Sequence, residues 1–211
     1  MIISVFVSSC GLPSSNVADA PVVRSTSAFS VEFSAPAEDT SIFGYEIYYK
    51  IYNATDTSSI ETDRLKFDTD LSSYDFESGD KKPDSLKFNR LNIGDLFTPT
   101  IKSIPVVSVD DLSSGDIVTI SIGPGSGTDG NGIISINGLE LIPLRIVLDD
   151  IYYKPFLNNV LSGDTDNNGV LKEDNQYSVS FVAYSYVSSI ITTSQSSYPV
   201  FLGTITDIPN N

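Results

Sequence analysis

Apolar and polar residues alternate along most of the chain, and this period of two is typical of β-strands with one buried face. The runs rich in Val, Ile, Tyr, Phe and Thr cover residues 22–23, 29–33, 43–51, 117–122, 132–141, 144–147, 177–184 and 200–204. Ser, Asp, Asn, Gly and Pro separate the runs, as expected of turns. No window of useful length repeats apolar residues at helical spacing. The pattern predicts an all-β chain folded as an antiparallel β-sandwich.

Two of these runs resemble strands of the fibronectin type III domain, a seven-stranded immunoglobulin-like sandwich. Residues 30–36 are similar to the second strand of that family, with Phe33 at the position where the family has tryptophan. Residues 42–50 resemble the third strand, whose recognisable core begins with a Gly-Tyr pair, here Gly44 and Tyr45. The resemblance implies an immunoglobulin-like fold for this chain.

A third segment, residues 171–183, resembles the sixth strand of the same family. The resemblance implies a tyrosine corner at Tyr177, with its ring in the core and its hydroxyl bonded to nearby backbone. Glu173 stands where the family usually has proline, which would loosen the corner. Together the three segments extend the resemblance over residues 20–53 and 165–206.

The spacing of these segments predicts a long insertion. A plain type III domain has about 100 residues in all, whereas here more than a hundred separate the third strand from the tyrosine corner. We therefore expect a signal remnant and tether at 1–20, a sandwich built from 21–53 and 146–208, and an insertion or β subdomain at 54–145. Inside the insertion, residues 117–122 and 132–136 predict a hairpin with a glycine-rich tip. Because long loops on rigid sandwiches often carry recognition, the insertion is the first place to look for function.

Strand alternation assigns a tyrosine-rich face to the third and sixth strands, which are neighbours in this fold. In the third strand the core-facing positions begin at Tyr45. The outward-facing apolar and aromatic side chains of the two strands are Tyr48, Tyr52, Val182 and Tyr184. Two interpretations stay open for this patch. Either the insertion folds over it, or it contacts a partner, since tyrosines are favoured anchors of interfaces.

The first ten residues are apolar or small, carry no charge and end at the only cysteine, Cys10. They look like the last part of a secretory h-region. Residues 7–10, Val-Ser-Ser-Cys, resemble the lipobox of bacterial lipoproteins, in the serine-containing form common among spirochaetal lipoproteins. The resemblance implies a lipidated Cys10 and an extracytoplasmic protein anchored in the bacterial cell envelope, at the outer membrane or the cell surface. The alternative is that residues 1–9 form a buried strand and Cys10 is a core thiol.

Composition narrows the chemistry that this chain can perform. The formal net charge is -15, from 27 acidic and 12 basic residues, and the sequence has no histidine. Without histidine and with one cysteine, the chain lacks the residues of a thiolate or imidazole zinc site and of a Ser-His-Asp or Cys-His catalytic centre. Because phosphate binding needs clustered Lys and Arg, we expect no nucleic-acid partner.

One acidic stretch has the spacing of a calcium loop. Oxygen ligands at the first, third, fifth and seventh positions of an EF-hand-type loop correspond to the side chains of Asp164, Asp166 and Asn168 and the carbonyl of Val170. The twelfth position is Asn175 instead of the usual bidentate Glu, which predicts weak affinity. The alternative is a plain turn, built from residues that tolerate positive φ.

These observations favour a non-catalytic binding or structural module, held at the membrane by a lipid anchor and meeting a protein or glycan partner at the cell envelope. A carbohydrate-active enzyme or carbohydrate-binding accessory module is the alternative, since such an enzyme needs two convergent carboxylates in a cleft. A calcium-stabilised adhesin is the second alternative. We expect no cofactor other than weakly bound calcium.

Overall fold

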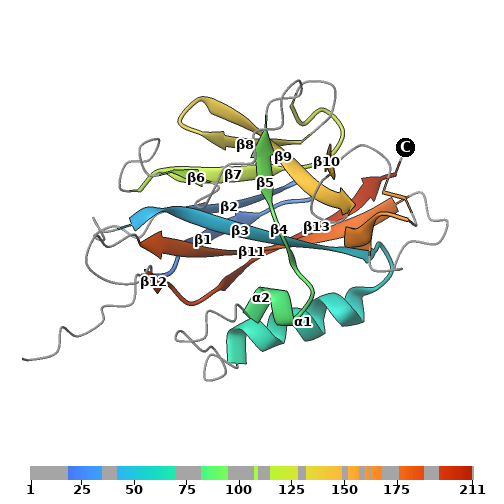
Figure 1. The fold of residues 1–211 in the computed structure, drawn as a ribbon, viewed down its shortest axis with the longest axis horizontal. Helices are drawn as coiled ribbons and strands as arrows, with labels where there is room; N and C mark the ends of the chain where they lie inside the picture. Colours follow the sequence, from blue (N-terminus) through green and yellow to red (C-terminus); the bar gives the residue numbers. More distant parts are fainter. Residues whose placement is uncertain are drawn as a thin grey trace, which may run out of the picture.

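The computed structural model describes residues 19–34, 42–69, 82–94, 107–108, 115–127, 132–148, 152–156, 160–161, 163–167, 176–187 and 195–210. Strands dominate these residues, and they form two antiparallel sheets (Figure 1). The predicted all-β sandwich is therefore confirmed at the level of fold class. Cys10, Asn168 and Val170 lie outside the described residues.

The first sheet has seven described strands. In spatial order they are β1 (Val22–Thr26), β2 (Ser30–Ser34), β7 (Ile117–Ser121), β8 (Ile133–Ile136), β9 (Leu139–Leu148) and β10 (Tyr152–Pro155), with β5 (Asn92–Gly94) paired to β9. The predicted hairpin is confirmed, because β7 and β8 pair antiparallel from Val118 opposite Ile136 to Ser121 opposite Ile133.

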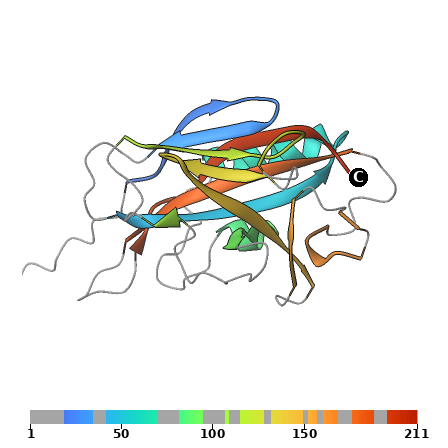
Figure 2. The same cartoon turned by 90° about the horizontal axis from the view of Figure 1, so that it is seen from above.

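The second sheet has six described strands. Its spatial order is β12 (Gln195–Ser196), β11 (Gln176–Val187), β3 (Ile42–Asn53) and β4 (Asn89–Arg90), with β13 (Val200–Pro209) beside β11 and β6 (Val107–Ser108) beside β3. The long strands β3 and β11 pair along nearly their whole length and lie side by side in both views (Figures 1 and 2). The predicted neighbours are neighbours in the structure.

The main core fills the space between the two sheets, and alternation along β3 and β11 decides which side chains enter it. Tyr45, Tyr49 and Val179 belong to this core, as do Phe33 and Ile120 of the first sheet. Apolar burial on this scale is the main favourable contribution to folding.

The tyrosine expected at the corner of the sandwich, Tyr177, has a fully buried ring. Its hydroxyl donates a hydrogen bond to the backbone carbonyl of Phe156, which lies 21 residues earlier in the chain. The ring lies in the core as predicted, but the backbone partner is not the nearby one that the resemblance implies. The contact ties β11 to the residue directly after β10, which is a longer-range link than a local turn would make.

The stretch 54–145, expected as an insertion, divides into two parts in the structure. Residues 117–145 supply β7, β8 and most of β9, and β7 pairs with β2 from Ser30 opposite Ser121 to Ser34 opposite Ile117. That part belongs to the sandwich itself, because its strands continue the first sheet. The earlier part also contributes the short strands β4 and β6, which pair with β3, and β5, which pairs with β9. It contains as well the helices α1 (Thr57–Thr69) and α2 (Lys82–Ser85), which lie on the side of β3 and β11 away from β7 and β8 (Figure 1).

Helix α1 was not expected from the spacing of apolar residues, and its sequence shows why. The side chains that turn toward the sheet are Ile60, Asp63 and Phe67, which have helical spacing. Asp63 occupies the middle of this set, so the apolar pattern is interrupted at a buried position. Leu65, by contrast, is apolar and 44% exposed. The buried residues of α1 therefore follow helical spacing, but its apolar residues do not.

Candidate functional site

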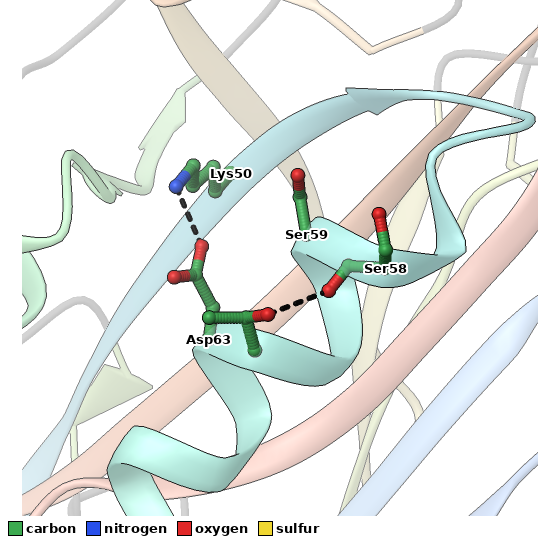
Figure 3. A pocket seen from close by; sticks show the side chains of 5 residues that line it. Lys50, Ser58, Ser59 and Asp63 are labelled. Atoms are coloured by element: carbon green, nitrogen blue, oxygen red, sulfur yellow. Dashed lines mark hydrogen bonds and ion pairs between the residues drawn. The ribbon is translucent and has the colours of Figure 1, made fainter.

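A small hollow of about 200 Å³ lies where the first half of α1 crosses β3. Its lining residues are Lys50, Ser58, Ser59, Thr62 and Asp63. Lys50 reaches from the strand toward Asp63 on the helix, and both serines stand on the first turn of α1 (Figure 3). The site is therefore made by one strand and one helix that are adjacent in sequence.

Hydrogen bonds from side chains fix the residue at which α1 begins. The turn before α1 is held by the Asn53 side chain, whose Oδ1 accepts the Thr55 N–H at 2.9 Å. Asp56 acts as the N-cap, since its Oδ1 accepts the Ser59 N–H at 3.1 Å and the Ser58 hydroxyl at 3.2 Å. Hydrogen bonds from the side chain and the backbone of Ser59 lower the pKa of Asp56. The lining serines thus also serve the helix start.

A charged pair forms one wall of the hollow. Lys50 Nζ lies 2.6 Å from Asp63 Oδ2 and donates to the Leu86 carbonyl at 2.9 Å. The same carboxylate oxygen accepts the Tyr52 hydroxyl at 2.9 Å. Burial and the neighbouring Asp63 raise the pKa of Tyr52, so this phenol remains a donor. Asp63 is consequently the shared acceptor for a cation and a phenol.

The chemistry of this hollow is that of hydrogen bonding. Lys50 is already paired with a carboxylate and a carbonyl, which makes it a charged donor and a poor base for a neighbouring serine. A glycosidase needs two carboxyl groups facing each other, and Asp63 is the one carboxylate among the described lining residues. The volume is below the range of about 300–1,000 Å³ typical of small-molecule sites. The arrangement suits a small polar group.

The predicted tyrosine face lies under α1 and α2. Tyr48, Val182 and Tyr184 form a second apolar cluster with Phe67 and Phe88, and all five side chains are at most 3% exposed. The Tyr48 and Tyr184 rings are 5.4 Å apart. The cluster thus closes the outer side of the second sheet.

Tyr52, the fourth residue of that face, is 2% exposed and bonds to Asp63. Of the two interpretations, the structure shows the covered face. The four side chains are not exposed, because α1 and the residues that follow α2, which belong to the expected insertion, pack on them through Phe67, Phe88 and Asp63.

The two described residues of the expected calcium loop face a cation of the chain itself. Arg145 on β9 is fully buried, and its Nη2 donates to Asp164 Oδ2 at 2.7 Å while its Nη1 donates to Asp166 Oδ1 at 2.9 Å. Lys154 Nζ lies 3.4 Å from the other oxygen of Asp164. Calcium binding stays a prediction, and these two carboxylates are engaged by guanidinium and ammonium groups.

A tyrosine from the opposite sheet completes this cluster. Tyr49 donates to Asp166 Oδ2 at 2.8 Å, and its oxygen accepts the Ile146 N–H at 2.8 Å. Burial, together with the neighbouring charge of Asp164, raises the pKa of Asp166, although Arg145 and Tyr49 act to lower it. Burial also acts to raise the pKa of Asp164. The hydrogen bonds from the Leu161 N–H and Arg145, together with the charges of Arg145 and Lys154, outweigh burial, so the pKa of Asp164 is lowered.

Lys50, Asp63 and Arg145 belong to no motif that predicts a role for them. A signal existed for two of them, because Lys50 and Arg145 each interrupt an apolar strand run. A charge at such a position predicts a buried partner. The sequence does not reveal that the partners are Asp63 and the pair Asp164 and Asp166, since these contacts join segments that only the fold brings together.

Comparisons with known proteins identify no relative. The chain matches no protein-family model, no curated protein and no solved structure. Within the part of the chain that the structure describes, no helix is long and apolar enough to cross a membrane. The same residues contain no group of three or more Cys, Asp or Glu side chains placed to hold a metal ion.

Proposed function

We propose that this chain is a non-catalytic binding or structural module of the bacterial cell envelope, held there by a lipid on Cys10. The observation that carries the proposal is how the fold uses its buried charges. Lys50 is paired with Asp63, and Arg145 is paired with Asp164 and Asp166. Each pair joins two segments of the fold, which is a structural use of ionisable groups. A catalytic acid or base, by contrast, must be available to a substrate, and the Asp63 oxygen is engaged by Lys50 and Tyr52.

Strand order supports a fibronectin type III-like framework. In an immunoglobulin-like sandwich the third strand lies next to the sixth, and the sixth lies next to the seventh. Here β3 pairs with β11, and β11 pairs with β13. The second strand, β2, pairs with β7 in the other sheet. Strands β8, β9 and β10 then extend that sheet beyond the plain framework.

The N-terminal sequence supports the anchor. An uncharged apolar run that ends in Ser8, Ser9 and Cys10 is followed by a polar stretch, and the first strand begins at Val22. Residues 11–21 would therefore link a lipid-bearing cysteine to the sandwich. Fully extended at about 3.4 Å per residue, they would reach roughly 35 Å. Such a tether would keep the module close to the membrane surface.

Metabolic labelling tests the anchor. The chain is expressed in a bacterial host with an alkyne-bearing fatty acid, and wild type is compared with Cys10→Ala and with Ser15→Ala in the tether. We expect label and detergent-phase partition for wild type and Ser15→Ala, and their loss in Cys10→Ala. Unlabelled wild type, or labelled Cys10→Ala, would show that Cys10 is not the anchor.

The hollow beside α1 supports a second candidate, a carbohydrate-binding role. Hydroxyls of Ser58, Ser59 and Thr62, together with the Lys50–Asp63 pair, offer donors and acceptors suited to a single sugar unit. Saturation-transfer NMR with a panel of monosaccharides tests it. We expect a signal that Thr62→Val weakens and that Thr26→Val, on β1 and not among the lining residues, leaves unchanged. No signal from any sugar would remove this candidate.

A further inference from the structure

Arg145 is a fully buried cation in the apolar stretch of β9. Its two terminal nitrogens donate to different carboxylates, Asp164 at 2.7 Å and Asp166 at 2.9 Å. A buried guanidinium is tolerated only where negative groups compensate its charge. Asp166 belongs to the short 3₁₀-helix η4 (Thr165–Asn167), and Asp164 directly precedes it. One short segment therefore supplies both carboxylates that compensate the charge of Arg145.

The loop is closed around this contact. Asp164 Oδ2 also accepts the Leu161 N–H at 2.9 Å, and the Asp164 N–H donates back to the Leu161 carbonyl at 3.1 Å. The Asn167 side chain donates to that same carbonyl at 3.0 Å. These bonds draw the two ends of the loop together. Its acidic oxygens are thereby directed inward, to the position of the guanidinium.

The guanidinium contacts the two carboxylates that the calcium-type spacing would offer to a metal ion. Asp164 and Asp166 stand at the first and third positions of the calcium-type spacing. When ionised they carry two negative charges, and Arg145 and Lys154 together carry two positive charges within 3.4 Å of their oxygens. A divalent cation held by two carboxylates would give the same balance. The side chains thus supply internally what Ca²⁺ would supply from solution.

The same cation also joins the two sheets. Arg145 belongs to β9 of the first sheet, and Tyr49 belongs to β3 of the second. Both bond to Asp166, one at each of its oxygens. Loss of the guanidinium would therefore loosen the contact between loop and sandwich and leave two carboxylates facing each other.

We propose that Arg145 is the resident cation of the segment that carries Asp164 and Asp166. It occupies the place that the sequence spacing would give to a divalent ion, so the native loop is closed without metal. Removing the guanidinium opens a latent site for a hard divalent cation at Asp164 and Asp166, because hard cations prefer carboxylate oxygens. This inference is independent of the lipid anchor and of the hollow beside α1.

Thermal unfolding with and without calcium tests the proposal on the intact chain. For wild type we expect the same Tm in millimolar CaCl₂ and in EDTA. For Arg145→Ala in EDTA we expect Tm to fall by about 10 °C. Added CaCl₂ should then raise the Tm of this variant in a saturable way. The double variant Arg145→Ala/Asp164→Ala is the matched control and should not respond to calcium.

Two results would overturn the proposal. One is a wild-type Tm that rises with CaCl₂ and loses this response in Asp164→Ala, since the loop would then hold calcium beside Arg145. The other is an Arg145→Ala variant whose Tm is lowered but does not respond to CaCl₂. If Arg145→Ala does not fold, Arg145→Gln replaces it, with isothermal calorimetry of Ca²⁺ binding as the readout and the wild type as the non-binding reference.

Discussion

Lys50 is a cation on a sheet face that aromatic rings and a helix cover. Its Nζ lies 5.2 Å from the centre of the Tyr52 ring and 5.6 Å from that of Phe88. Such contacts offset part of the cost of removing the ammonium from water. The larger compensation comes from Asp63, at 2.6 Å. A single carboxylate on α1 thus determines whether this lysine can remain beneath the helix.

Replacing Asp63 with alanine should therefore destabilise the protein far more than replacing a surface acid of the same helix. Asp63→Ala leaves the Lys50 ammonium and the Tyr52 hydroxyl without their shared acceptor, and we expect a loss of about 3 kcal/mol in the free energy of unfolding. Asp68→Ala removes an exposed pair with Arg64 and should cost less than about 1 kcal/mol. Urea unfolding of both variants measures the difference. Equal losses would contradict the structural role of the Lys50–Asp63 pair.

At the scale of the element, α1 is attached to the sheet mainly through one aromatic side chain. Phe67 is 3% exposed and packs against Phe88 with ring centres 5.4 Å apart, and against Phe201 at 6.3 Å. The isolated helix would be marginal at thirteen residues, so its stability depends on this packing. Phe67 is thus the apolar counterpart of Asp63, one helical turn further along.

Phe67→Ala should release the helix while the sandwich persists. We expect a loss of about 3 kcal/mol, because a buried aromatic side chain leaves a cavity that the site fills only in part. Hydrogen exchange of the α1 amides should accelerate more than exchange of the β11 amides, since β11 keeps its partners β3 and β13. Leu65→Ala, at an exposed position of the same helix, is the control and should change neither quantity appreciably. Equal acceleration in α1 and β11 would show that the helix is not a separate cover.

The strands could be predicted from the sequence because each keeps one face in the main core. Alternation along β3 and β11 correctly placed Tyr45 and Tyr49 inside and Tyr48 outside. It could not tell that the outer face is also buried, since a face covered by a helix and a face turned to a partner have the same apolar pattern. Apolar spacing does not reveal the helix, because Asp63 occupies its buried middle position, where contacts with Lys50 and Tyr52 make an acid favourable.

Across the whole molecule, β3 and β11 separate two apolar clusters, and buried tyrosines on these strands carry hydroxyls that join different layers. Tyr49 bonds to the Asp166 loop, Tyr177 to the Phe156 carbonyl, and Tyr52 to Asp63 of the helix. Burial is the first cause that raises the pKa of all three phenols above the ordinary value of 10.0, and acidic neighbours add to it. The layers of the fold are thus linked by groups that must stay protonated.

This linkage predicts a steep loss of stability in alkali. The pKa of each phenol is raised in the folded state, so its contribution is fully present below pH 10.0, the ordinary pKa of tyrosine, and is lost as pH rises above it. Above that pH the unfolded chain releases three protons that the folded chain retains. Stability should then fall by up to about 4 kcal/mol per pH unit from these groups.

Tyr52→Phe should reduce the slope by about a third, because one of the three groups no longer titrates. The measurement is urea unfolding from pH 8 to 11, followed together with tyrosinate absorbance. Ionisation of these phenols before unfolding, or an unchanged slope in Tyr52→Phe, would contradict the linkage between the layers.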